Sequence, residues 1–171
     1  MYETFISFNY FRDYIYILIM RTLILLLLIS FFSQIAFSQN QTSELDTLLD
    51  YWHLQASKAK FDNYFKVTSD NFVFLGTAPG ERWNKKLFME FSKPYFDKGK
   101  AWDFKAKSRN WIFSIDGKTA WFDEELDTWM NTCRGSGICV KKKGKWKLAY
   151  YNLTVLIENE KIDDFIKLRE E

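Results

Sequence analysis

The chain has 171 residues, of which 27% are charged and 19% are aromatic, and its formal net charge is +2 at pH 7. So small a net charge gives no support for a nucleic-acid partner, and one histidine with two cysteines falls short of a zinc site with standard spacing. The sequence also lacks a glycine-rich phosphate loop and a nucleophile motif. Binding proteins and cofactor-free enzymes are therefore the classes to weigh.

An export signal is the first recognisable segment. Residues 20–29 join a basic start to a short apolar run, and Ala36 and Ser38 place small side chains three and one positions before Gln39. This is the pattern of a signal peptide over residues 20–38, cleaved after Ser38. We therefore expect export, to the periplasm or out of the cell.

This interpretation divides the rest of the chain into a segment before the signal peptide and a domain after it. Residues 1–19 are then upstream translation or disordered, and residues 39–171 form a single domain with no membrane anchor after cleavage. The competing interpretation is an uncleaved anchor over residues 14–32. It would bury Arg21 in the middle of the membrane, at a cost of about 2.5–3.5 kcal/mol.

Helical spacing begins at Ser43, whose hydroxyl can cap a helix that runs to about Lys60. The apolar residues of this helix recur on one face, at Leu45, Leu48, Leu49, Trp52, Ala56 and Ala59. His53, the only imidazole in the chain, lies off this line and is expected at the surface or in helix packing. After a break, residues 61–67 predict a second, short helical segment.

A strand and a third helix follow. Residues 71–75 are rich in β-forming side chains, and residues 76–80 have the glycine and proline of a turn. A helix is predicted over about 84–91. Pro94 either ends this helix or starts one further turn to Asp97.

From residue 101 onward, apolar side chains alternate with polar ones, which predicts strands. Four long strands in meander order are expected over 101–115, 119–127, 137–143 and 146–157, with a hairpin turn at Asp116-Gly117 and a closing helix over 161–168. This order predicts an α+β domain with helices on one face of an antiparallel sheet. Seven tryptophans indicate a strongly curved sheet whose hollow side is filled by large rings.

The two cysteines and a lysine-rich segment favour structural roles. Cys133 and Cys139 would lie about 20 Å apart in an extended strand. A disulfide between them would need a tight turn at residues 134–137. The lysines of residues 141–145 surround Gly144 and are typical of a solvated hairpin turn rather than a phosphate site.

Two segments, Arg134–Val140 and Lys143–Thr154, resemble the SnoaL-like branch of the nuclear-transport-factor-2-like superfamily, and the likeness runs from about Leu45 to Asn159. The resemblance implies a cone-shaped, cystatin-like α+β domain whose N-terminal helices pack on the concave side of the sheet and enclose a pocket. Proteins of this kind are often dimeric through the outer face of the sheet, so the resemblance is also compatible with a homodimer. Members include isomerases, dehydratases and cyclases as well as proteins that only bind.

Strand parity predicts which side chains face the pocket. Trp146, Leu148, Tyr150, Asn152 and Thr154 share one face of their strand, and we expect that face to point inward. In resembling sequences a pocket histidine often stands where this chain has Asn152. An amide can hold a ligand there but cannot take a proton near pH 7, which favours binding over catalysis.

Glu125 and Asp123 are the candidate catalytic residues, and Arg134 is expected across a neighbouring strand. Three interpretations stay open: an ion pair of Glu125 with Arg134 that closes the sheet, a pair that anchors a ligand, or a carboxylate that acts as a general base. The predicted ligand-binding residues are Tyr64, Trp83, Trp121, Glu125, Arg134, Tyr150 and Asn152.

The sequence thus predicts an exported domain that binds a small, mostly apolar molecule in an aromatic-lined pocket, without a metal or cofactor. The alternative is a cofactor-independent isomerase, dehydratase or cyclase that uses a pocket carboxylate as base. A third hypothesis is an interaction protein that dimerises through the exposed face of its sheet and has no ligand.

Overall fold

The computed structural model describes the backbone of residues 2–170 and the side chains of residue 18, residues 20–28, residue 39 and residues 41–170. The chain forms two compact units, Met1–Glu44 and Leu45–Glu171. The side chains of Ala36 and Ser38, on which the predicted cleavage site rests, lie outside the described residues, so cleavage and export stay predictions. Within the described part of the chain, no helix is both long enough and apolar enough to cross a membrane.

Helix α1 runs from Tyr2 to Ser57, so the predicted helix start at Ser43 is wrong. The reason is local, because residues 39–44 contain no glycine or proline that would interrupt a helix. The predicted apolar face does form. Its buried residues are Leu45, Leu49, Trp52 and Ala56. The helix ends at Ser57, and Ala59 turns the chain with a left-handed φ of 52°.

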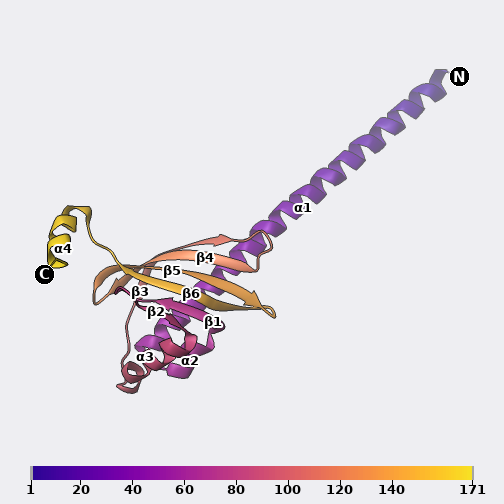
Figure 1. The fold of residues 1–171 in the computed structure, drawn as a ribbon. Helices are drawn as coiled ribbons and strands as arrows, with labels where there is room; N and C mark the ends of the chain where they lie inside the picture. Colours follow the sequence, from indigo (N-terminus) through magenta and orange to yellow (C-terminus); the bar gives the residue numbers. More distant parts are fainter. Residues whose placement is uncertain (1, 171) are drawn as a thin grey trace. The chain divides into compact units, whose positions relative to one another are not determined.

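Helices α2, Phe61–Lys66, and α3, Lys85–Asp97, lie together on one side of the sheet (Figure 1). Asn84 caps α3, because its side-chain oxygen accepts a backbone N–H of the first turn at 3.0 Å. Pro94 lies inside α3 instead of ending it. The further turn carries Phe96, and burial of this ring holds the end of the helix in place despite the missing N–H of the proline.

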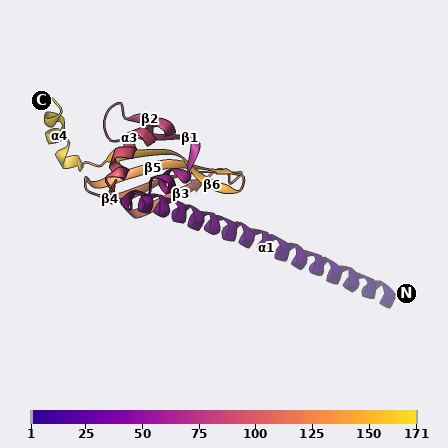
Figure 2. The same ribbon diagram turned by 90° about the horizontal axis from the view of Figure 1, so that it is seen from below.

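Six strands form one mixed sheet in the order β2-β1-β6-β5-β4-β3. Their bounds are Thr68–Leu75 for β1, Arg82–Asn84 for β2, Lys105–Phe113 for β3, Thr119–Thr128 for β4, Asn131–Lys142 for β5 and Lys145–Val155 for β6. Strands β3 to β6 form the predicted antiparallel meander. Strand β1 covers the edge of β6 and pairs with it in parallel, so the sheet is not wholly antiparallel as predicted. Helix α3 lies beside β1 and β2 (Figure 2).

Strand β3 begins later than the alternating pattern predicts. Trp102 and Phe104 precede it in an irregular segment, where Phe104 is buried and Trp102 is half-buried. Their spacing of two comes from a loop that inserts into the core, not from a strand. Strand β2 was not predicted, because three residues are too few to show alternation.

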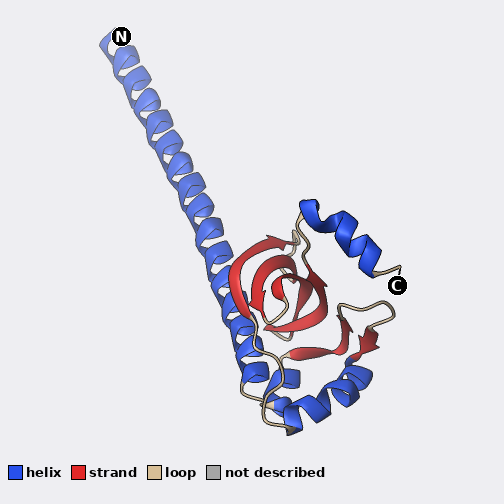
Figure 3. Cartoon of the chain, turned by 90° about the vertical axis from the view of Figure 1, so that its left-hand side faces the viewer, coloured by secondary structure: helices blue, strands red, loops and turns tan. Residues whose placement is uncertain are grey.

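The sheet is strongly curved but does not close on itself, and Figure 3 shows its strands curling with α2 and α3 to one side. Gly137 leaves room for the ring of its cross-strand partner Phe122, since a Cβ atom at Gly137 would lie 2.7 Å from that ring. Beyond β6, the 3-10 turn Asn159–Lys161 leads into α4, Ile162–Leu168. This predicted closing helix stands away from the sheet and buries none of its residues.

A β-bulge at Ala149 interrupts β6. Ile138 of β5 pairs with Tyr150, and the next residue, Cys139, pairs with Leu148, so Ala149 has no partner in the register. An inserted residue of this kind reverses the alternation of side chains beyond it. The two halves of β6 therefore present opposite sets of residues to the interior.

Burial confirms the reversal. Trp146 and Leu148 are buried as predicted, but beyond the bulge the buried side chains are Tyr151 and Leu153. The prediction that the later residues of this strand also point inward is therefore wrong, because strict alternation along the sequence does not account for the inserted residue. The side chains that lie on the outer face instead are Tyr150, Asn152 and Thr154.

A candidate ligand pocket lined by aromatic rings

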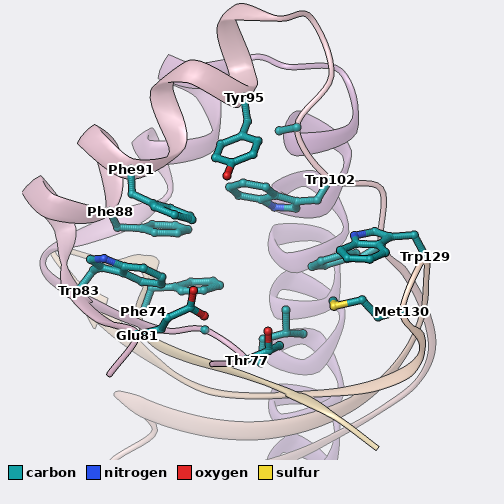
Figure 4. Close-up of a pocket in the computed structure, with 14 residues that line it drawn as sticks. Phe74, Thr77, Glu81, Trp83, Phe88, Phe91, Tyr95, Trp102, Trp129 and Met130 are labelled. Carbon is teal, nitrogen blue, oxygen red and sulfur yellow. The ribbon is translucent and has the colours of Figure 1, made fainter. Parts of the chain in front are cut away.

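A pocket of about 230 Å³ opens at the end of the sheet where β4 turns into β5 (Figure 4). One wall comes from β1, β2 and α3 and is built of Phe74, Trp83, Phe88 and Phe91. Phe74 and Phe88 stack with ring centroids 4.1 Å apart, and Trp83 and Phe91 stack at 4.5 Å. Stacking of this kind stabilises the arrangement of these rings by about 0.5–1.5 kcal/mol per pair.

The facing wall comes from the segment before β3 and from the β4–β5 turn, and its large side chains are Trp102, Phe104, Trp129 and Met130. Trp129 is 81% exposed although it lies against the pocket. The turn that presents it is well defined, since the backbone N–H of Met130 donates to the Thr128 hydroxyl at 2.9 Å. Figure 4 shows Tyr95, which is 45% exposed, reaching from α3 toward Trp102 at the edge of the pocket.

Glu81 is the one charged side chain among the fourteen residues that line the pocket. Its Oε2 accepts the backbone N–H of Ala78 at 2.9 Å, and its own carbonyl accepts the N–H of Gly76 at 2.9 Å. A Cβ atom at Gly76 would lie 2.2 Å from Oε2, so the absence of a side chain there lets the carboxylate fold over the loop. The polar part of the pocket is therefore fixed by the turn between β1 and β2.

A second group of polar side chains is buried under the helices, around Glu124, which is 1% exposed. Its Oε1 lies 2.9 Å from His53 Nε2 and 2.8 Å from the Tyr151 hydroxyl, and its Oε2 lies 2.9 Å from Arg109 Nε. Burial alone would raise the pKa of Glu124. His53, Arg109 and Tyr151 outweigh it and lower the pKa from 4.5 to about 2.

This buried network ties α1 to the sheet. Arg109 reaches Asp46 Oδ1 at 3.1 Å and Asp50 Oδ1 at 3.0 Å, and the indole N–H of Trp111 donates to Asp46 at 2.8 Å. Both oxygens of Glu124 are occupied, and the carboxylate stays ionised, so it is not poised to accept a proton near pH 7. The network is a scaffold for the fold, in which His53 Nε2 donates to the carboxylate.

Two positions were predicted for His53, at the surface or packed against its helix. The side chain is 5% exposed, so it is not at the surface; it packs between α1 and the sheet, 6.2 Å from the Tyr151 ring. The predictions from the sequence did not identify Glu124 as a buried acid. Its position was readable in principle, because Phe122 and Leu126 flank it at spacings of two on the same strand face. An apolar pair around a carboxylate signals a buried, partnered acid.

The structure brings few of the predicted ligand-binding residues together. Trp83 lines the pocket, and Tyr64 lies fully buried behind it, 5.7 Å from the Trp102 ring. Glu125 lines a separate cleft beside α4 and pairs in register with Arg134. Neither Glu125 nor Asp123 is among the residues that line the aromatic pocket. The predicted residues on the outer face are Trp121, Asp123, Glu125, Arg134, Tyr150 and Asn152.

Helices against a strongly curved mixed sheet, with an aromatic pocket at one end, define a cystatin-like α+β domain of the NTF2-like superfamily. Within that superfamily the chain belongs to the SnoaL-like domain family, whose model matches residues 45–158. The resemblance read from the sequence is thereby confirmed. A search of curated proteins returned no match.

Solved structures share the fold at low sequence identity. An NTF2-like protein of unknown function from Pseudomonas putida is 12% identical, covers 69% of this chain and 88% of its own, and has a TM-score of 0.57. A protein of unknown function with a cystatin-like fold from Nostoc punctiforme is 14% identical, and the match covers 67% of this chain and 90% of that protein, with a TM-score of 0.53. A candidate scytalone dehydratase from Novosphingobium aromaticivorans is 8% identical over 70% and 87%, with a TM-score of 0.60.

Proposed function

We propose that this chain is an exported protein whose SnoaL-like domain binds a small, mostly apolar molecule in the aromatic pocket. The observation that carries the proposal is the exposure of large rings at an already formed cavity: Trp129 is 81%, Tyr95 45% and Phe91 39% exposed. Exposed aromatic side chains around a concavity are typical of ligand sites. At about 230 Å³, the pocket is below the usual range of about 300–1,000 Å³, which favours a compact ligand.

Fluorescence titration with the neutral probe N-phenyl-1-naphthylamine tests this proposal. The purified chain should bind the probe, and Trp83→Ala should weaken binding by about tenfold or more, because it removes one ring from the wall. Trp121→Ala is the matched control, since Trp121 is an exposed tryptophan on the outer face of the sheet. Absence of binding, or equal losses in the two variants, would refute the proposal.

A cofactor-independent isomerase or dehydratase is the second candidate, favoured by one carboxylate, Glu81, inside the pocket. Catalysis would require Glu81 to take a proton from a bound substrate. Small aromatic ketones incubated with the chain in D₂O should then gain deuterium next to the carbonyl, and Glu81→Gln should abolish the gain. Exchange no faster than in buffer would leave binding as the function.

A homodimer through the outer face of the sheet is supported by a row of apolar side chains. Ile112, Trp121, Ile138 and Tyr150 are successive cross-strand partners from β3 to β6. Ile112 is 56%, Trp121 42% and Ile138 38% exposed. Sedimentation should show a dimer that Ile138→Glu dissociates, and a monomer at high concentration would argue against this interface.

A further inference from the structure

We propose that the ligand of the aromatic pocket carries an alkylated ammonium group, such as the trimethylammonium head of choline. The inference rests on the proposed binding function and adds the charge of the ligand to it. Two features carry it: the pocket has one carboxylate and no lysine, arginine or histidine among its fourteen lining residues, and its walls are aromatic.

The charge of the pocket is unbalanced. Glu81 is half-buried, and the lining residues offer no positive side chain that would neutralise it. A neutral ligand would displace water from the carboxylate without replacing the lost solvation. A cationic ligand would supply the missing countercharge in a site of low polarity, where attraction between charges is stronger than in water.

The rings favour a large, weakly hydrated cation. Trp83, Trp102 and Trp129 all line the cavity, and tryptophan attracts a cation over its face more strongly than the other aromatic residues do. In Figure 4, Trp102 lies on one side of the cavity and Glu81 on the other, with Trp83 and Trp129 between them on opposite walls. A cation in the middle of the cavity would meet rings and the carboxylate at once.

Other cations suit this pocket less well. A metal ion such as Ca²⁺ needs six to eight oxygen ligands, whereas the walls are mostly carbon. A primary ammonium group would need acceptors for three N–H donors, and the polar side chains of the pocket include only Glu81, Thr77 and Tyr95 with oxygen atoms. A fully alkylated ammonium has no N–H group and meets the rings with its methyl groups.

The test compares choline with 3,3-dimethyl-1-butanol, which has the same shape with a carbon atom in place of the charged nitrogen. Each is used to displace N-phenyl-1-naphthylamine from the purified full-length chain. We expect choline to bind at least tenfold more tightly than the neutral alcohol. Glu81→Gln, which keeps size but removes charge, should reduce choline affinity about tenfold and should not weaken binding of the alcohol or the probe, because neither neutral molecule gains from the carboxylate.

The control variant is Glu90→Gln, because Glu90 is an exposed acid on α3 outside the pocket lining, and it should bind choline like the natural chain. Equal affinities for choline and the alcohol, or choline binding that Glu81→Gln leaves intact, would overturn the inference. If the probe still binds in those cases, the proposed binding function stands. Failure of the probe and of choline together would overturn both.

Discussion

Replacing Glu124 by glutamine should destabilise the fold by about 3 kcal/mol. The magnitude follows from the carboxyl group itself, whose pKa falls from 4.5 to about 2 on folding. At about 1.4 kcal/mol for each pKa unit, this difference stabilises the folded state by about 3 kcal/mol above pH 4.5. Glutamine keeps the size of the side chain but leaves Arg109, whose side chain is 6% exposed, without its most buried partner.

Urea unfolding followed by tryptophan fluorescence measures this effect, because all seven tryptophans lie in the second unit, between Trp52 and Trp146. The depressed pKa also fixes the pH dependence. Its contribution is present above pH 4.5 and is lost as the pH falls toward 2, so the natural chain should weaken through this window and Glu124→Gln much less. Glu125→Gln, on the exposed face, is the control and should change stability by less than about 0.5 kcal/mol.

The reasoning is refuted if Glu124→Gln costs less than about 1 kcal/mol at pH 7. It is refuted equally if the variant loses stability in acid as steeply as the natural chain. Either result would mean that His53, Arg109 and Tyr151 do not favour the ionised form of Glu124 by the amount given above.

Three further outcomes are expected. Gly135→Ala should lower the melting temperature and reduce the free energy of unfolding by about 1–3 kcal/mol, because the new Cβ atom would lie 2.2 Å from the Tyr151 hydroxyl. A melting temperature within about a degree of that of the natural chain would contradict this contact. Cys139 should resist maleimide labelling in the folded protein and react after denaturation, since burial raises the pKa of its thiol. Rapid labelling of the native chain would show that the core around Cys139 is open to the reagent. Lys143→Asn should raise the melting temperature slightly, because residue 143 has a φ of 50° in the β5–β6 turn and asparagine adopts a positive φ more readily than lysine does. A lower melting temperature would show that the lysine side chain stabilises the turn.

Periodicity predicted the elements of the second unit well. The apolar face of α1, the four strands of the meander and the closing helix all follow from local spacing, and local spacing survives in the fold. The parallel pairing of β1 with β6 was not predicted, because it joins segments about eighty residues apart and leaves no local pattern.

The candidate site was harder to predict than the fold. One inserted residue, Ala149, moved Tyr150 and Asn152 to the outer face, and no composition signal marks it. Trp83 was identified because it follows a turn, but Glu81 was passed over, since a carboxylate in a loop is ordinarily solvated. Only the three-dimensional course of that loop brings Glu81 against the rings.

The parallel pair of β1 and β6 also sets the order in which the sheet can be completed. The neighbour of the first strand is the last one to be synthesised, so β1 has only the three-residue β2 beside it until the chain has been extended through Val155. Contacts this distant in sequence form late in folding. A chain cut short before residue 145 would lack the strand that joins β1 to the meander, and should behave as two unjoined fragments of a sheet rather than as a smaller version of the domain.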